Sequence, residues 1–362
     1  MKKQGTIAFM CEPGKVEYRT YELPKPEKGA LLMKLKRCNV CGSELHIWKG
    51  SMPRTTFGHE GVGTVAELGE GVTTDSAGRP LAIGDRIVST YFSACGKCVH
   101  CNRGEFYKCD NAYAHKWKPD TEEWPHFFGM FATHYYIWPD YKFYKVPENV
   151  PDSVAGVCNC AVPQVLFGYD KADLRMGDWV LIQGAGGLGL FAAAAAKVAG
   201  AKVIVVDGVP ARLEQAKKFG ADYIIDMNEY DTPEKRHMRA KELVNGEGVD
   251  MAVELTGVPA AFKEGFGYIR SCGKYLSMGN VTLGTTVDID PAALTKQQAV
   301  IIPVNRYQPW YIDKALHFIS DTIDRFPYED MIDADYPFDR LADAMNDSVA
   351  RKVTRASIVI DG

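Results

Sequence analysis

Four cysteines within fifteen positions constrain the fold of this chain more than any other feature. Cys95, Cys98, Cys101 and Cys109 are spaced so that four thiolates can close around one tetrahedral metal ion. An iron–sulfur run would have its fourth cysteine after about three residues, followed by proline, so the spacing here favours zinc. The alternatives are a disulfide pair or scattered buried thiols, and neither requires this spacing. Because four sulfur ligands leave no open position, we expect a structural zinc lobe at about residues 95–109 and chemistry elsewhere.

The middle of the chain predicts a doubly wound parallel sheet. From about residue 177 to 305, short β-branched runs alternate with helical segments, which is typical of strands covered on both faces. The expected helices include Leu188–Ala199 and Ala211–Phe219. The expected strands are Trp179–Gln183, Lys202–Asp207, Tyr223–Asp226, Asp250–Leu255, Lys274–Met278 and Ala299–Val304.

The two flanking segments differ from the middle. The first is rich in glycine, proline and short alternating runs such as Ala30–Leu35 and Gly61–Leu68, which indicates a β-rich domain with long loops. The last holds too little structure to fold alone, namely helices at Tyr311–Ile319 and near Leu341–Met345 and a strand at Ala356–Ile360. We therefore expect an α/β protein with a first domain at residues 1–160, a second at 161–304, and a return to the first domain at 305–362.

A glycine-rich loop lies between the first strand and the first helix of the predicted parallel sheet. It reads Gly184-Ala185-Gly186-Gly187-Leu188-Gly189, and this context turns a weak GxGxxG match into a strong prediction of dinucleotide binding. The helix N-terminus that follows stabilises phosphate charge. Asp207 ends the next strand, where a carboxylate binds ribose hydroxyls and repels a 2′-phosphate, so NAD is favoured over NADP. Arg212 lies nearby and is compatible with either a phosphate contact or an ordinary surface position.

A second group of metal-binding side chains lies upstream of the cysteine lobe. Cys41, Ser43, Glu44 and His46 stand close together, and His59 and Glu60 follow a glycine. Thiolate, imidazole and carboxylate in glycine-punctuated loops suit a catalytic zinc with three protein ligands and one exchangeable position. Taken singly, each residue is as compatible with an ordinary buried side chain.

In this order, the CGxxxH segment, GHE, the cysteine lobe, GxGxxG and a terminal basic segment resemble the zinc-dependent alcohol dehydrogenases of the medium-chain dehydrogenase/reductase family. The resemblance spans essentially the whole chain. It implies a GroES-like catalytic domain built from both ends of the chain, a Rossmann domain between them, and an active site in the cleft. It also implies two zinc ions per chain and a homodimer or homotetramer.

The same resemblance implies roles for individual residues. Cys41 and His59 match zinc ligands, and Glu60 matches a carboxylate that supports or joins the metal. Ser43 and His46 match the hydroxyl and the imidazole of a proton relay. Glu44 stands where the family usually has aspartate, and its expected role is to orient a ligand.

Two further roles leave alternatives open. The third zinc ligand is either Cys158 or Cys160, and we expect Cys160. In the terminal segment Arg355 resembles an arginine that binds the cofactor pyrophosphate, with Lys352 as the competitor.

The implied reaction is reversible oxidation of an alcohol to an aldehyde or ketone by hydride transfer to NAD. Aromatic residues such as Trp48, Trp117, Trp124, Phe127 and Phe128 suggest a bulky, cyclic or aromatic alcohol, although packing explains them equally well. The rival functions are a zinc-free NADPH-dependent quinone or enone reductase and a non-catalytic nucleotide-binding protein.

The charge composition of the chain favours small molecules as binding partners. The formal net charge is −4 and no Lys/Arg-rich tract occurs, so nothing favours nucleic acid or an anionic membrane surface. No signal peptide or uninterrupted apolar stretch of about eighteen residues is apparent, and we expect a cytoplasmic protein without membrane contact.

Overall fold

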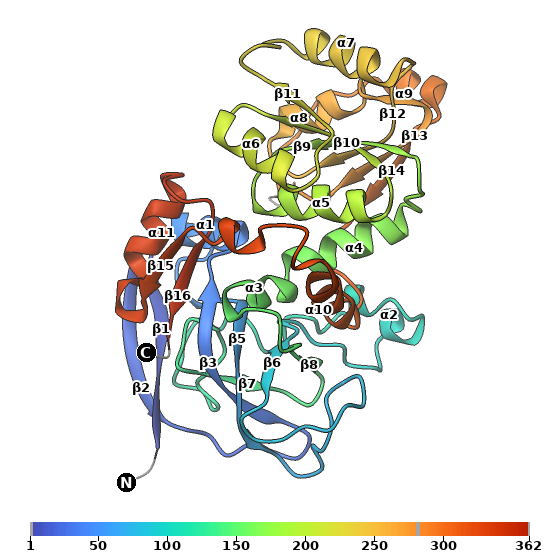
Figure 1. Ribbon diagram of the computed structural model, residues 1–362. Coiled ribbons are helices and arrows are strands. Elements are labelled where there is room, and N and C mark those ends of the chain that lie inside the picture. Colours follow the sequence, from blue (N-terminus) through green and yellow to red (C-terminus); the bar gives the residue numbers. More distant parts are fainter. Residues whose placement is uncertain (1–2, 280–282, 361–362) are drawn as a thin grey trace. The chain divides into compact units, whose positions relative to one another are not determined.

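A computed structural model describes residues 3–279 and 283–360 (Figure 1). The chain divides into two compact units, one formed by Met1–Pro163 with Gln308–Gly362 and the other by Gln164–Tyr307. The domain boundaries expected from the sequence, after residues 160 and 304, lie three residues before the boundaries between these two units. The α/β class is confirmed, with a β-rich first unit and a parallel sheet in the second.

The first unit is built on a seven-stranded sheet with the order β15-β16-β3-β5-β6-β8, in which β7 also pairs with β3. Strand β16 pairs antiparallel with β3, so the end of the chain completes the sheet begun near its start. The strands are β3 (Leu31–Asn39), β5 (Glu60–Leu68), β6 (Arg86–Ser89), β7 (His134–Ile137), β8 (Phe143–Lys145), β15 (Ala334–Pro337) and β16 (Ala356–Val359).

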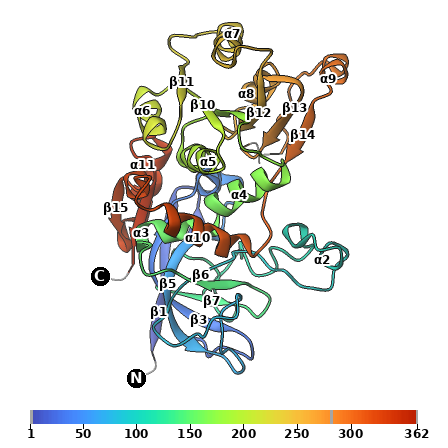
Figure 2. The ribbon, with the colours of Figure 1, turned by 45° about the vertical axis from the view of Figure 1, so that its right-hand side comes forward.

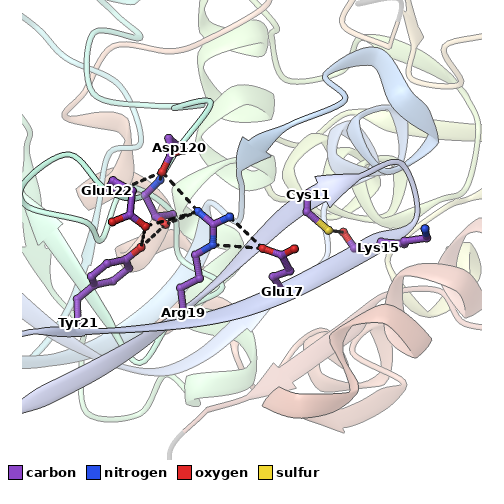
Figure 3. A network of polar contacts seen from close by, with 8 residues as sticks. Cys11, Lys15, Glu17, Arg19, Tyr21, Asp120 and Glu122 are labelled. Carbon is purple, nitrogen blue, oxygen red and sulfur yellow. Dashed lines mark hydrogen bonds and ion pairs between the residues drawn. The ribbon is translucent and has the colours of Figure 1, made fainter.

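A smaller sheet of order β2-β1-β4 belongs to the same unit. Its strands are β1 (Gln4–Glu12), β2 (Lys15–Glu22) and β4 (Thr55–Thr56). Polar side chains tie β2 to the loop at residues 117–126: Arg19 contacts Asp120 and Thr121, and Tyr21 contacts Thr121 and Glu122 (Figure 3). That loop is therefore anchored at its middle.

Short helices connect and cover the strands of the first unit. They are α1 (Gly42–His46), α2 (Val99–Asn102), α3 (Asp152–Ala155), α10 (Tyr311–Thr322) and α11 (Leu341–Val349). Strands β3 and β5 are largely buried and contribute to one apolar core, which includes Leu31, Met33, Leu35, Val65 and Ile358. Trp48 and Phe127 also pack into this core. Their apolar character therefore serves packing, the alternative that the sequence left open.

The second unit is a six-stranded parallel sheet of order β11-β10-β9-β12-β13-β14. Its strands are β9 (Trp179–Gln183), β10 (Lys202–Asp207), β11 (Tyr223–Asp226), β12 (Val249–Glu254), β13 (Ile269–Ser277) and β14 (Val300–Pro303). Its helices pack against the strands they connect (Figure 2). They are α5 (Gly187–Val198), α6 (Pro210–Lys218), α7 (Pro233–Val244), α8 (Pro259–Gly265) and α9 (Pro291–Gln297), preceded by α4 (Ala161–Lys171).

All six strands of the parallel sheet lie where the sequence predicted them, with β13 beginning earlier than expected. The first part of β13 consists mostly of exposed residues, so no run of apolar residues in the sequence marks the start of this strand. In the described part of the chain, no helix has the length and apolar character needed to cross a membrane.

Candidate metal and nucleotide sites

Three segments of the first unit bring four metal-binding side chains together. Cys41 follows β3, His59 and Glu60 stand at the start of β5, and Cys160 lies just before α4. One ligand atom from each residue lies within 4.8 Å of the others. Because β3 and β5 are neighbouring strands, their adjacent ends bring Cys41 close to the start of β5.

The spacing of the two sulfur atoms fits a zinc ion. Cys41 Sγ lies 3.9 Å from Cys160 Sγ. Two thiolates on one tetrahedral zinc lie about 3.8 Å apart, because each Zn–S bond is about 2.3 Å long. Cys158 is not in the described cluster. It is fully buried, and burial raises the pKa of its thiol, as expected for a packing residue.

Glu44 contacts both ends of the cluster. It is 1% exposed; one of its carboxylate oxygens accepts a hydrogen bond from the Cys41 backbone N–H at 3.0 Å, and the other lies 3.0 Å from His59 Nδ1. A carboxylate at Nδ1 holds the proton there and leaves Nε2 as the metal donor. This is the contact that a ligand-orienting role requires.

Glu60 forms a buried ion pair with Arg355. Arg355 Nη1 donates to Glu60 Oε2, and both side chains are almost completely buried. Glu60 Oε1 has no hydrogen-bond partner within the described residues, so a buried donor oxygen remains available to a metal. Burial raises the pKa of Glu60 to about 8, although the Arg355 charge opposes the shift. The pyrophosphate contact of Arg355 stays a prediction, and Lys352 is exposed and paired with Asp347.

The close packing of these side chains shifts their pKa values. The hydrogen bond from Cys160 lowers the pKa of the Cys41 thiol well below its usual range and raises the pKa of Cys160. Burial and the Lys116 charge lower the pKa of His59, but Glu44 and Cys41 outweigh them and raise it to about 9. A metal ion that binds His59 must displace a proton from the His59 imidazole.

Helix α1 carries the two residues of the expected proton relay. Ser43 and His46 are exposed and lie three residues apart, so they share one face of the helix, whereas Glu44 between them is buried. The short helix thus separates the ligand-orienting carboxylate from the two groups expected to move a proton.

The four-cysteine lobe forms a second cluster. One sulfur from each of the four cysteines lies within 4.8 Å of the others, and Cys95 Sγ is 4.0 Å from Cys101 Sγ. Backbone N–H groups of Cys95 and Cys101 donate to Cys109 and Cys98 sulfur atoms at 3.4 Å. Hydrogen bonds lower the pKa of Cys95 to about 6. The largest effect comes from the Lys97 backbone N–H and the next largest from the Asn111 side chain. The sulfur donors fit one closed zinc site, with every cysteine of the chain in the free-thiol state.

The glycine loop has the local geometry that phosphate binding requires. Gly184 has φ +99°, which favours glycine, and a Cβ at Gly189 would lie 1.9 Å from the Gly184 carbonyl oxygen. A Cβ at Gly186 would meet nothing within 4 Å, so the backbone is open to a ligand at the point where α5 begins. Gly187 and Leu188 form the first turn of α5.

Asp207 has a structural contact that the sequence did not indicate. It ends β10 and is 8% exposed; its carboxylate accepts hydrogen bonds from Ala185 N at 2.7 Å and from Val209 N at 2.8 Å. Asp207 therefore ties the glycine loop to β10, in addition to its predicted contact with ribose. Arg212 is half-buried on α6.

Lys116 is a buried residue that sequence reasoning missed. Its side chain is 6% exposed, and its Nζ lies 4.0 Å from the centre of the Tyr91 ring and 4.4 Å from that of Trp117. Burial lowers the pKa of Lys116 to about 8. A lysine among aromatic residues is common on protein surfaces, so nothing in the local pattern indicated that it is buried.

Comparisons with known proteins agree with this architecture. The family models "Alcohol dehydrogenase GroES-like domain" and "Zinc-binding dehydrogenase" match residues 27–148 and 187–321. A 5-exo-hydroxycamphor dehydrogenase from Pseudomonas putida is 32% identical, covering 93% of this chain and 94% of the relative. A sorbitol dehydrogenase from Halalkalibacterium halodurans is 34% identical over 71% of each chain.

Solved structures give the same result over nearly the whole chain. An alcohol dehydrogenase from Thermotoga maritima superposes with a TM-score of 0.92 at 26% identity, covering 99% of this chain and 100% of the other. The benzyl alcohol dehydrogenase of Acinetobacter calcoaceticus superposes with a TM-score of 0.85 at 27% identity, with the same coverage.

Proposed function

The chain belongs to the zinc-type medium-chain alcohol dehydrogenases, and from that premise we propose that it oxidises alcohols with NAD at a zinc ion held by Cys41, His59 and Cys160. Its action on CH–OH groups follows from the family. The observation that carries the zinc assignment is the convergence of two thiols, an imidazole and a carboxylate oxygen of Glu60 within 4.8 Å of one another. A second zinc in the four-cysteine lobe brings the proposed content to two per chain. Family membership favours an alcohol dehydrogenase over the zinc-free reductase and over the non-catalytic nucleotide-binding protein.

The residues around the cluster have different roles in alcohol oxidation. A zinc ion, when bound, acts as a Lewis acid that makes an alcohol hydroxyl more acidic. Ser43 accepts the hydroxyl proton and releases its own, and His46 passes a proton on towards solvent, because both side chains are exposed on one face of α1. Glu44 holds His59 in the tautomer that presents Nε2.

The cofactor assignment rests on the end of β10. NAD supplies the hydride acceptor when bound, and the open backbone at Gly186 and the N-terminus of α5 receive its phosphates. The Asp207 carboxylate disfavours a 2′-phosphate. We expect Asp207→Asn, which removes the charge and keeps an acceptor for one of the two backbone N–H groups of Ala185 and Val209, to raise kcat/KM for NADP relative to NAD. An unchanged ratio would contradict the NAD preference.

We also propose that the substrate is a bulky or cyclic alcohol. Two of the similar proteins are named for hydroxycamphor and benzyl alcohol, both of which contain rings. Tyr91 and Trp117 supply aromatic surface in the first unit, and Tyr91 packs against His59 with ring centres 4.7 Å apart. Apolar and aromatic surface of this kind favours a ring-containing substrate.

The test is NAD reduction by a panel of cyclic and aromatic alcohols. We expect Cys41→Ala, His59→Ala and Cys160→Ala to abolish turnover while NAD binding persists. Cys158→Ala is the matched control, because it removes a neighbouring buried thiol outside the cluster, and it should keep its turnover. A Cys41 or His59 variant with wild-type rates would refute the assignment.

A further inference from the structure

Lys116 is an ammonium group buried without an acceptor. Only 6% of the residue is exposed, and its Nζ has no hydrogen-bond partner among the described residues. Transfer of an ammonium from water to such a place is strongly unfavourable unless it is paired. The contacts with the Tyr91 and Trp117 rings offset only a part of this desolvation cost. A buried donor of this kind requires an explanation.

The ammonium faces the proposed catalytic cluster. The Tyr91 ring that contacts Lys116 Nζ at 4.0 Å also packs against the His59 imidazole, so the ammonium and a proposed zinc ligand contact the same aromatic ring. The groups whose negative charge, when they are ionised, acts on Lys116 are Glu44 and the thiols of Cys160, Cys41 and Cys38. The first three of these groups are already committed: Glu44 bonds to His59, and the Cys160 and Cys41 thiols are proposed metal ligands.

The segment around Lys116 is held in place. Thr56 and Lys118 exchange hydrogen bonds at 2.9 and 3.1 Å, and the contacts of Arg19 and Tyr21 fix Asp120, Thr121 and Glu122 (Figure 3). Trp117, next to Lys116, has φ +54°, a conformation that is unfavourable for a tryptophan. The surrounding contacts therefore impose a strained backbone that directs the lysine inwards.

The neighbouring anionic groups already have other partners, and the position of Lys116 is fixed. Its ammonium is therefore suited to donate a hydrogen bond to an acceptor on a ligand. We propose that Lys116 is a specificity-determining residue that binds an oxygen acceptor on the substrate, a carboxylate in preference to a neutral oxygen. The preferred substrate would then be a ring-containing alcohol that also carries a carboxylate. This inference rests on the proposed function, because the reacting hydroxyl must lie at the zinc site.

The kinetic test compares cyclohexanol with 2-, 3- and 4-hydroxycyclohexanecarboxylate. We expect the zinc-loaded wild-type enzyme to prefer the best of the three acids over cyclohexanol in kcat/KM. In Lys116→Met that preference should fall about tenfold to a hundredfold, as for loss of one charge-assisted hydrogen bond. Lys116→Arg should restore part of it. Lys118→Met is the matched control, because Lys118 is paired with Glu123, and it should retain the wild-type ratio.

Two further measurements do not depend on turnover. Titration calorimetry with cyclohexanecarboxylate should show binding to the zinc-loaded wild type that weakens at least tenfold in Lys116→Met. The Tm of Lys116→Met should match or exceed the wild-type value, because the variant removes a buried unpaired charge.

The outcomes separate this inference from the proposed function. If no alcohol is oxidised but Lys116-dependent carboxylate binding is seen, the function fails and the lysine assignment stands. If cyclohexanol is oxidised and Lys116→Met leaves the acid-to-alcohol ratio unchanged, the lysine assignment is overturned and the function stands. A lower Tm with loss of zinc in Lys116→Met would also overturn it, by making Lys116 a structural partner of the cluster.

Discussion

At the scale of single residues, Glu44 is the group on which the geometry of the catalytic cluster depends. Its carboxylate accepts from the Cys41 backbone and faces His59 Nδ1. In Glu44→Gln, an amide N–H would face Nδ1 and favour the tautomer with its proton on Nε2, the atom needed for the metal.

We expect Glu44→Gln to weaken zinc at the Cys41 cluster about tenfold to a hundredfold. Competition with a chelator measures this affinity, and the four-cysteine lobe provides the internal control because Glu44 does not contact it. Equal zinc affinity in the wild type and the variant would contradict the orienting role.

His134 at the start of β7 should give the protein an acid-sensitive stability. It is 9% exposed, and burial, with smaller effects from Lys34 and Lys3, lowers its pKa to about 4. The unfolded chain has a His134 pKa near its ordinary value and binds this proton more readily, so stability is lost as pH falls below about 6.5.

The measurement is the free energy of unfolding at pH 7 and pH 5. The wild type should lose about 1–2 kcal/mol more than His134→Gln over this interval. If both proteins lose the same amount, burial of a neutral His134 has no influence on acid stability.

Which residues carry the chemistry was partly visible in the sequence. Cys41, His59, Glu60 and the four lobe cysteines stand in recognisable spacings, and the structure gathers them into two clusters. The contacts of Arg355 with Glu60 and of Asp207 with Ala185 join distant positions, so no local pattern indicates them. Burial of Lys116 depends likewise on aromatic partners supplied by the fold.

At the scale of elements, the parallel strands were predictable because each is a short apolar run between recognisable helices. Strand β10, for example, begins and ends at the expected residues, Lys202 and Asp207. The short turns around the metal ligands were not predictable, because Gly156–Asn159 and α1 are held by contacts with other segments. Strand β14 is the other informative element, since it lies at the edge of the parallel sheet.

Strand β14 has exposed apolar side chains, including Val300 at 48% and Ile301 at 41%. An exposed apolar edge favours pairing with another chain. We propose that a second copy covers it, and that Ile301→Lys shifts the protein towards monomers in light scattering after gel filtration. Met238→Lys, at an exposed position on α7, is the control. A wild-type protein that is monomeric would contradict the proposed homo-oligomer.

At the scale of the whole molecule, family membership accounts for the order of the two metal clusters and the nucleotide loop along the chain. The first unit holds both clusters, and its sheet is completed by β16 from the end of the chain. Arg355, just before β16, reaches Glu60 through that connection. The terminal segment is therefore part of the proposed catalytic centre as well as of the fold.

We propose that this chain holds one closed and one open zinc site. Elemental mass spectrometry of the purified protein after mild dialysis measures zinc per chain directly. We expect about two zinc ions per chain, falling to about one in Cys41→Ala. One zinc per chain in the wild type, under conditions that exclude metal loss during purification, would contradict it.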